Sequence, residues 1–256
     1  MGLTHVLSLL LVLVSAGSAF AQGEWIEYAN REDGFLSNFP SEPKVEAITW
    51  TTSYGYTLPA KVFRADKGRE RYSVTVVDYR GLEQLGIARA KACPAGAETC
   101  LGNQVGGPIG DGYWRMDLRG AMANAIFRYI QRPGKVTELT YQFQELVEGY
   151  VVHLTTPDES RTIAYITMHE GRLYIWEGTV PKGSPEPGLF MGSVGFSDAD
   201  GNRIRYQTIY SQAYHGLREY PLPARAGQGG GGGRQGGGRQ GGAAGGGAAP
   251  QGAGGR

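Results

Sequence analysis

This chain of 256 residues contains few cysteines, and its sequence shows no recognisable set of catalytic residues. Cys93 and Cys100 are the whole complement. Their spacing is not the C-x-x-C of a redox motif, and no histidine lies near them in sequence to complete a metal site. In an exported protein such a nearby pair predicts a disulfide, and closing so short a loop would contribute roughly 2.5 kcal/mol.

A hydrophobic run long enough to cross a bilayer, about 20 residues, is also missing. The apolar run from Val6 to Val14 is shorter, and it is followed by small residues and by Ala19-Phe20-Ala21, an A-x-A cleavage pattern. This order predicts a signal peptide over residues 1–21, although the segment before the run has no Lys or Arg. The absence of a cysteine after the cleavage site argues against a lipoprotein anchor. We expect a mature chain that starts at Gln22 and is periplasmic or secreted, with an uncleaved membrane anchor as the alternative.

Large apolar side chains are absent from residues 224–256, where 17 of the 33 residues are glycine. Such a segment has no apolar surface whose burial could offset the conformational entropy lost on ordering, so a disordered tail is expected. The tail carries four arginines and no acid, which leaves a net charge of −3 on the rest of a chain whose total is +1. A mildly acidic body argues against nucleic-acid binding by the folded part. The Gly-Arg-Gln repeats are similar to RGG segments, so nucleic-acid binding by the tail stays open as an alternative.

Between these ends, the alternation of apolar and polar residues predicts one α+β domain over residues 22–223. The expected strands form two antiparallel meanders, residues 24–28, 35–39, 44–53, 57–65 and 71–79 and then 136–147, 150–156, 161–169 and 172–180, followed by a last strand over 203–212. The expected helices cover residues 82–92, 118–131 with Asp117 as N-cap, and 189–196.

The segment from Arg161 to Phe196 has the strongest hydrophobic pattern in the chain. In its second strand Leu173 and Ile175 lie on one face and Tyr174 and Trp176 on the other. A strand that is apolar on both faces is normally central and covered on both sides. The pattern therefore places this hairpin in the middle of the sheet.

Several short motifs resemble those of PsbP-like and Mog1-like domains. Asp33–Phe35, Asn38–Pro40 and Pro43 together resemble their opening D-G-F-x-x-x-F-P-x-x-P, and Arg172–Ile175 followed by Val180–Phe196 is similar to their second half. The resemblance covers most of residues 24–211 and implies an α/β/α sandwich, with a central antiparallel sheet of about six or more strands packed by helices. It also implies a binding or assembly role rather than catalysis. No functional residue of the family has a match here, and the cysteine-containing insertion and the tail depart from a minimal domain of this type.

Four residues are candidates for ligand or metal binding. His153 and His169 lie on strands that could be neighbours, and two histidines with a carboxylate could hold zinc, although no H-x-x-x-H or H-x-H spacing is present. Asp198 and Asp200 begin a stretch similar to a calcium loop, but Arg203 and Ile209 replace the Gly and Glu that an EF-hand requires. An ordinary turn and surface histidines explain these residues equally well, so we expect no cofactor.

The sequence thus predicts an exported, non-catalytic protein that binds a partner or ligand at the cell envelope. The sequence has a clear pattern of strands and helices but no catalytic motif, and this contrast supports the interpretation. The alternative is an enzyme of unknown class, hydrolase-like, in which the insertion over residues 93–112 serves as a lid over a cleft.

Overall fold

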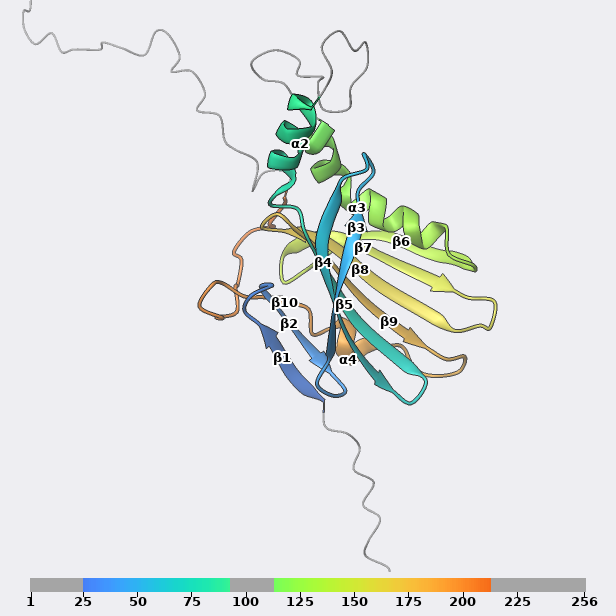
Figure 1. Ribbon diagram of the computed structural model, residues 1–256. Coiled ribbons are helices and arrows are strands. Elements are labelled where there is room, and N and C mark those ends of the chain that lie inside the picture. The colour runs from blue at the N-terminus through green and yellow to red at the C-terminus, as the bar shows by residue number, and fades with distance from the viewer. Residues whose placement is uncertain (1–24, 93–112, 213–256) are drawn as a thin grey trace, which may run out of the picture. The chain divides into compact units, whose positions relative to one another are not determined.

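The computed structural model describes residues 25–92 and 113–212, which form a seven-stranded antiparallel sheet with layers on both faces (Figure 1). The strand order is β3-β4-β5-β9-β8-β7-β6, and every neighbouring pair is antiparallel. The strands are β3 (Lys44–Thr51), β4 (Thr57–Lys67), β5 (Glu70–Asp78), β6 (Lys135–Gln144), β7 (Val147–Thr155), β8 (Arg161–His169) and β9 (Arg172–Val180). The predicted α+β class with a central antiparallel sheet is confirmed.

The predicted central hairpin occupies the middle of this sheet. Strands β8 and β9 have the predicted bounds, and they pair from Arg161 opposite Val180 to His169 opposite Arg172. A two-residue turn joins them, in which Glu170 and Gly171 both have positive φ. Two such residues match the right-handed twist of a hairpin. Side chains from both faces of β9 are buried, as the apolar pattern predicted.

Helices cover one face of the sheet. α3 (Tyr113–Ile130) contacts β6, β7 and β8, and α2 (Leu82–Lys91) packs against α3. The predicted helix over 118–131 is therefore confirmed, but it begins five residues earlier. Asp117 is inside the helix instead of at its N-cap, and its buried carboxylate accepts hydrogen bonds from Thr52 Oγ1 and from Tyr54 N at 3.1 Å.

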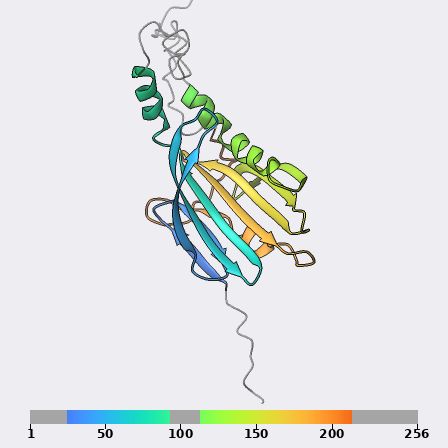
Figure 2. The same cartoon turned by 45° about the vertical axis from the view of Figure 1, so that its right-hand side comes forward.

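The opposite face is covered mainly by a second, smaller sheet, so the layers are not a simple α/β/α sandwich (Figure 2). This sheet has the order β1-β2-β10 and consists of β1 (Ile26–Asn30), β2 (Phe35–Phe39) and β10 (Gly195–Phe196). A single helical turn, α4 (Gly188–Met191), lies beside it and contacts β2, β8 and β9. Phe35 packs from this layer against Trp176, and Phe39 packs against Phe190; all four side chains are fully buried.

Four expectations about the strands and helices are corrected. The first two strands form this smaller sheet with β10 instead of joining the meander of β3 to β5, and residues 189–196 are split between α4 and β10. No strand covers residues 203–212, where only two isolated bridges pair Arg203 with Ser197 and Tyr210 with Val147. The strand expected to reach Val147 ends at Gln144, because Glu145 and Leu146 form a hairpin turn with φ of 50° and 61°.

All described residues lie in one compact unit of the chain. Within them, neither the length nor the apolar character of any helix is sufficient for it to span a membrane. The signal-peptide prediction over 1–21 and the tail over 224–256 concern residues outside the described ranges. The same holds for Cys93, Cys100 and the insertion over 93–112.

Candidate ligand-binding groove

The face of the main sheet that carries α3 changes from apolar to polar along the length of its strands. Ile175 on β9 and Val77 on β5 belong to the core packed with α3. Residues two apart in a strand share a face, so the same rows continue as Glu177 and Thr179 on β9 and as Thr75 on β5. Apolar side chains therefore give way to polar ones where the strands extend past the helix.

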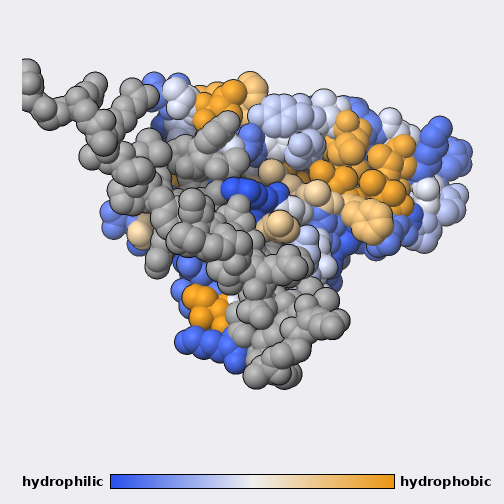
Figure 3. Space-filling model, turned by 90° about the horizontal axis from the view of Figure 1, so that it is seen from above, coloured by the Kyte–Doolittle hydropathy of each residue, from blue (hydrophilic) through white to orange (hydrophobic). Residues whose placement is uncertain are grey.

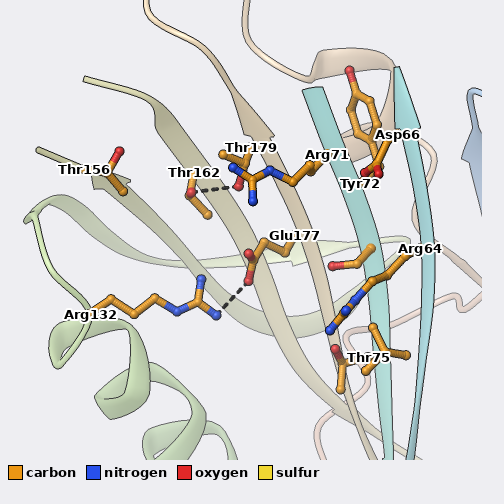
Figure 4. A pocket seen from close by; sticks show the side chains of 12 residues that line it. Arg64, Asp66, Arg71, Tyr72, Thr75, Arg132, Thr156, Thr162, Glu177 and Thr179 are labelled. Carbon is orange, nitrogen blue, oxygen red and sulfur yellow. Dashed lines mark hydrogen bonds and ion pairs between the residues drawn. The ribbon is translucent and has the colours of Figure 1, made fainter. Parts of the chain in front are cut away.

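These polar rows line a groove of about 550 Å³ across β4, β5, β9 and β8 (Figure 4). Its polar lining residues are Arg64, Asp66, Arg71, Tyr72, Ser73, Thr75, Arg132, Thr156, Thr162, Glu177 and Thr179. The ladder brings them together although they come from distant segments, since Ser73 lies opposite both Arg64 and Glu177. The groove thus combines three guanidinium groups, two carboxylates and a set of hydroxyls.

One of the three arginines is already paired. Arg132 Nη2 donates to Glu177 Oε2 at 2.9 Å, and its guanidinium lies 4.0 Å from the centre of the Tyr129 ring. The Tyr129 hydroxyl donates to the same oxygen at 2.5 Å. Burial and the neighbouring carboxylate raise the pKa of Tyr129 well above its usual value, so this phenol remains a donor. Glu177 is thereby held in place by two groups at the C-terminal end of α3.

The other two arginines are available to a ligand. Arg64 lies 3.5 Å from Glu46, but both side chains are about 60% exposed, and such a pair contributes little. Arg71 makes no ion pair with any residue in the described ranges, and it lies opposite Asp66 in the ladder. Beside them, the hydroxyls of Thr162 and Thr179 are hydrogen-bonded to each other at 2.8 Å. The groove can therefore offer two guanidinium groups and hydroxyl partners to an anion.

The structure separates the two candidate histidines. His153 is on β7, half-buried, with its Nδ1 3.8 Å from Glu138. His169 is at the end of β8, six residues beyond Ile163, which pairs with His153. It is 1% exposed. Its burial, and to a smaller extent the positive charge of Arg172, lower the pKa of His169 to about 4.

The candidate aspartates belong to a turn. Asp198 Oδ1 accepts hydrogen bonds from Asp200 N at 3.0 Å and from Asn202 N at 2.8 Å. These donors lower the pKa of Asp198, led by Asn202. In residues 25–92 and 113–212, no three His, Cys, Asp or Glu side chains gather as a metal site would require.

The groove was missed from the sequence, although a weak pattern pointed to it. Arg71, Ser73 and Thr75 alternate with buried residues on β5, and Glu177 and Thr179 continue the apolar row of β9. Polar residues at every second position of a strand indicate that one of its faces is exposed to solvent. Which strands share that face follows only from the order of the sheet.

Comparison with known proteins finds similarity among solved structures. No family model matches the chain, and no curated protein is similar to it at a significant level. Among solved structures, the chain matches the solution structure of cyanobacterial PsbP (CyanoP) from Synechocystis sp. PCC 6803, at 11% sequence identity and a TM-score of 0.33. The match covers 66% of this chain and 88% of that one.

Proposed function

We propose that this protein is an exported, non-catalytic binding protein that takes an anionic ligand in the groove. The observation that carries the proposal is the pair Arg64 and Arg71, which share an open sheet face with a row of hydroxyl groups. A guanidinium group binds carboxylate and phosphate through two parallel hydrogen bonds. Hydroxyl groups can both donate and accept, so they suit the polar remainder of such a ligand.

The size and lining of the groove support this chemistry. Its volume is within the range of roughly 300–1,000 Å³ that ligand sites occupy. Most such sites are mainly apolar, whereas this one is lined largely by charged and hydroxyl side chains, which favours a polar ligand. An acidic polymer of the cell envelope has the required charge and polarity.

Calorimetric titration tests the proposal with three probes: oligogalacturonate for carboxylate, inorganic polyphosphate for phosphate and a neutral maltooligosaccharide as control. We expect one of the two anionic probes to bind and the neutral one to fail. The double variant Arg64→Gln/Arg71→Gln should weaken binding about tenfold or more, since a hydrogen bond to a charged group contributes roughly 1.5–3 kcal/mol.

Arg205→Gln is matched to the single variant Arg71→Gln, since each removes one positive charge. Arg205 is an exposed arginine whose nearest ion-pair partner, Glu145, is 4.0 Å away and outside the groove. Arg205→Gln should retain the wild-type affinity. Equal losses in the two variants, or equal binding of neutral and anionic probes, would show that only overall charge attracts the ligand and would exclude the groove.

The cellular location is part of the same proposal. The apolar run followed by an A-x-A pattern at the start of the chain supports export. Mass spectrometry of the protein purified from the envelope and the medium should give a mature N-terminus at Gln22. An intact chain confined to the cytoplasmic fraction would contradict export.

A further inference from the structure

Strand β6, at one edge of the main sheet, exposes a row of large apolar side chains. Leu139, Tyr141 and Phe143 are 48%, 51% and 49% exposed. They are two residues apart along the strand, so they share one face. Only β7 pairs with β6 in the described parts of the chain, which leaves the other side of its backbone without a strand.

The row faces the side of the sheet that carries α3. Leu139 lies opposite Val152, a member of the core packed under that helix, and the rings of Tyr141 and Tyr150 are 5.8 Å apart. Helix α3 contacts β6 and itself exposes Phe127 and Ile130, which are 54% and 53% accessible. We call these five residues, Phe127, Ile130, Leu139, Tyr141 and Phe143, the β6 patch. Figure 3 shows apolar residues gathered on the surface above α3 and β6.

The opposite edge of the same sheet is built differently. β3 follows Pro43, and it carries Lys44 and Glu46 on exposed positions. Charges and a proline are the usual protection of an edge strand against pairing with another chain. In β6 the last six residues, 139–144, have no charge and no proline. This edge is therefore open to pairing, and its apolar side chains favour it.

We propose that a second copy of this chain binds here, with β6 pairing antiparallel to β6 about a two-fold axis at Tyr141. This register places Leu139 opposite the partner's Phe143 and Tyr141 opposite its own copy. Glu138 is then opposite the partner's Gln144, so no two like charges face each other. A two-fold interface must be complementary to itself, and this row of residues meets that condition.

The exposed area is adequate for such a contact. Five large side chains that are each about half exposed offer roughly 500 Å² per copy. A standard interface buries about 800 Å² per partner, and the backbone and polar side chains of β6 would supply the remainder. A strand of another protein could pair with the same edge. However, residues 139–144 carry no charge that would select a particular foreign strand, whereas the row is complementary to a second copy of itself in the proposed register.

Sedimentation velocity of the mature chain, residues 22–256, tests the proposal. We expect twice the monomer mass. Tyr141→Lys places two like charges face to face at the axis, so it should weaken dimerisation at least about tenfold. Ala47→Lys adds the same charge to the opposite edge, at the exposed Ala47 of β3, and should leave the dimer intact. Circular dichroism verifies that both variants are folded.

Cross-linking tests the register independently. In the proposed register, Tyr141→Cys brings two thiols together across the axis and should give a disulfide-linked dimer on mild oxidation. Leu139→Cys should not, since its partner across the axis is residue 143. A wild-type monomer at all concentrations, or a dimer that persists in Tyr141→Lys, would overturn the proposal. Equal cross-linking of the two cysteine variants would overturn the register.

Discussion

His169 Nε2 lies 2.6 Å from the hydroxyl oxygen of Tyr206, beneath a cover of aromatic rings. The ring of Phe196 is 4.3 Å away and that of Tyr210 is 4.8 Å away, between centroids. These contacts tie the end of β8 to residues 203–212, which have no ladder of their own. His169 thus acts as a core residue that anchors the last described segment.

The first prediction concerns the stability of the protein in acid. Burial lowers the pKa of His169 from 6.5 to about 4, so the unfolded chain takes up a proton that the folded chain resists. The contribution to stability is complete above about pH 6.5, decreases as the pH falls and is lost near pH 4. It should amount to about 3 kcal/mol.

Urea unfolding at pH 7, 5.5 and 4 measures this contribution. Other groups also titrate in this range, so the quantity of interest is the difference between the wild type and His169→Gln. The variant should be less stable at pH 7 but should lose less stability toward pH 4. Thr49→Ser changes an exposed side chain on β3 that has no titratable group, and it should follow the wild-type slope. Parallel slopes for all three proteins would contradict the assignment.

The second prediction concerns the joint between α3 and the turn before β4. Thr52 Oγ1 donates to the buried carboxylate of Asp117 and accepts from Tyr56 N at 3.0 Å. Asp117→Ala leaves buried donors without an acceptor, so it should lower the free energy of unfolding by about 2 kcal/mol.

A double-mutant cycle with Thr52→Val should give a coupling energy of about 0.5–3 kcal/mol, measured by chemical denaturation. Asp200→Ala serves as the control, because Asp200 is exposed and its side chain makes no hydrogen bond or ion pair with any other described residue. Its effect should be within about 0.5 kcal/mol. Additive effects of Asp117→Ala and Thr52→Val would show that the two residues act separately.

The third prediction contrasts two glycines. Gly149 on β7 approaches β8 closely: an added Cβ would be 2.5 Å from the Ile166 carbonyl oxygen and 2.7 Å from the Tyr165 ring. Gly149→Ala should therefore cost about 1–3 kcal/mol. Gly120 in α3 has open space around the corresponding position, so Gly120→Ala should stabilise the helix by up to about 1 kcal/mol. Thermal unfolding should shift in opposite directions for the two variants, and a shift in the same direction would contradict the packing described for Gly149.

The parts of the fold that sequence predicted well are those in which turn chemistry and periodicity agree. The β8–β9 hairpin is an example, because Gly171 marks its turn and the apolar pattern on each side is long. The β6–β7 turn was misplaced because Glu145 and Leu146 adopt positive φ without the glycine or asparagine that normally signals it. Contacts with distant parts of the chain hold that turn, and the hydrophobic periodicity of the sequence gives no sign of such contacts.

The groove could not be predicted for a different reason. Its residues come from β4, β5, β8 and β9 and the end of α3, and β5 pairs with β9 although about a hundred residues separate them in the chain. The residues chosen from the sequence lie elsewhere: His169 is in the core and Asp198 accepts hydrogen bonds in a turn. Residue type alone does not show which side chains share a surface.

The last prediction concerns the charge balance of the groove and depends on its proposed role. Glu177 neutralises Arg132, so its removal should release a third guanidinium group for the ligand. Glu177→Gln keeps an oxygen that can accept from Tyr129 while removing the negative charge, which limits the structural cost. Since an exposed ion pair contributes about 0.2–1 kcal/mol, the affinity for the anionic probe should rise by about threefold. Glu27→Gln removes an exposed acid on β1, in the smaller sheet on the opposite face of the main sheet, and it should leave the affinity unchanged. Equal gains in the two variants, or a loss in Glu177→Gln with the fold intact, would show that Arg132 does not contact the ligand.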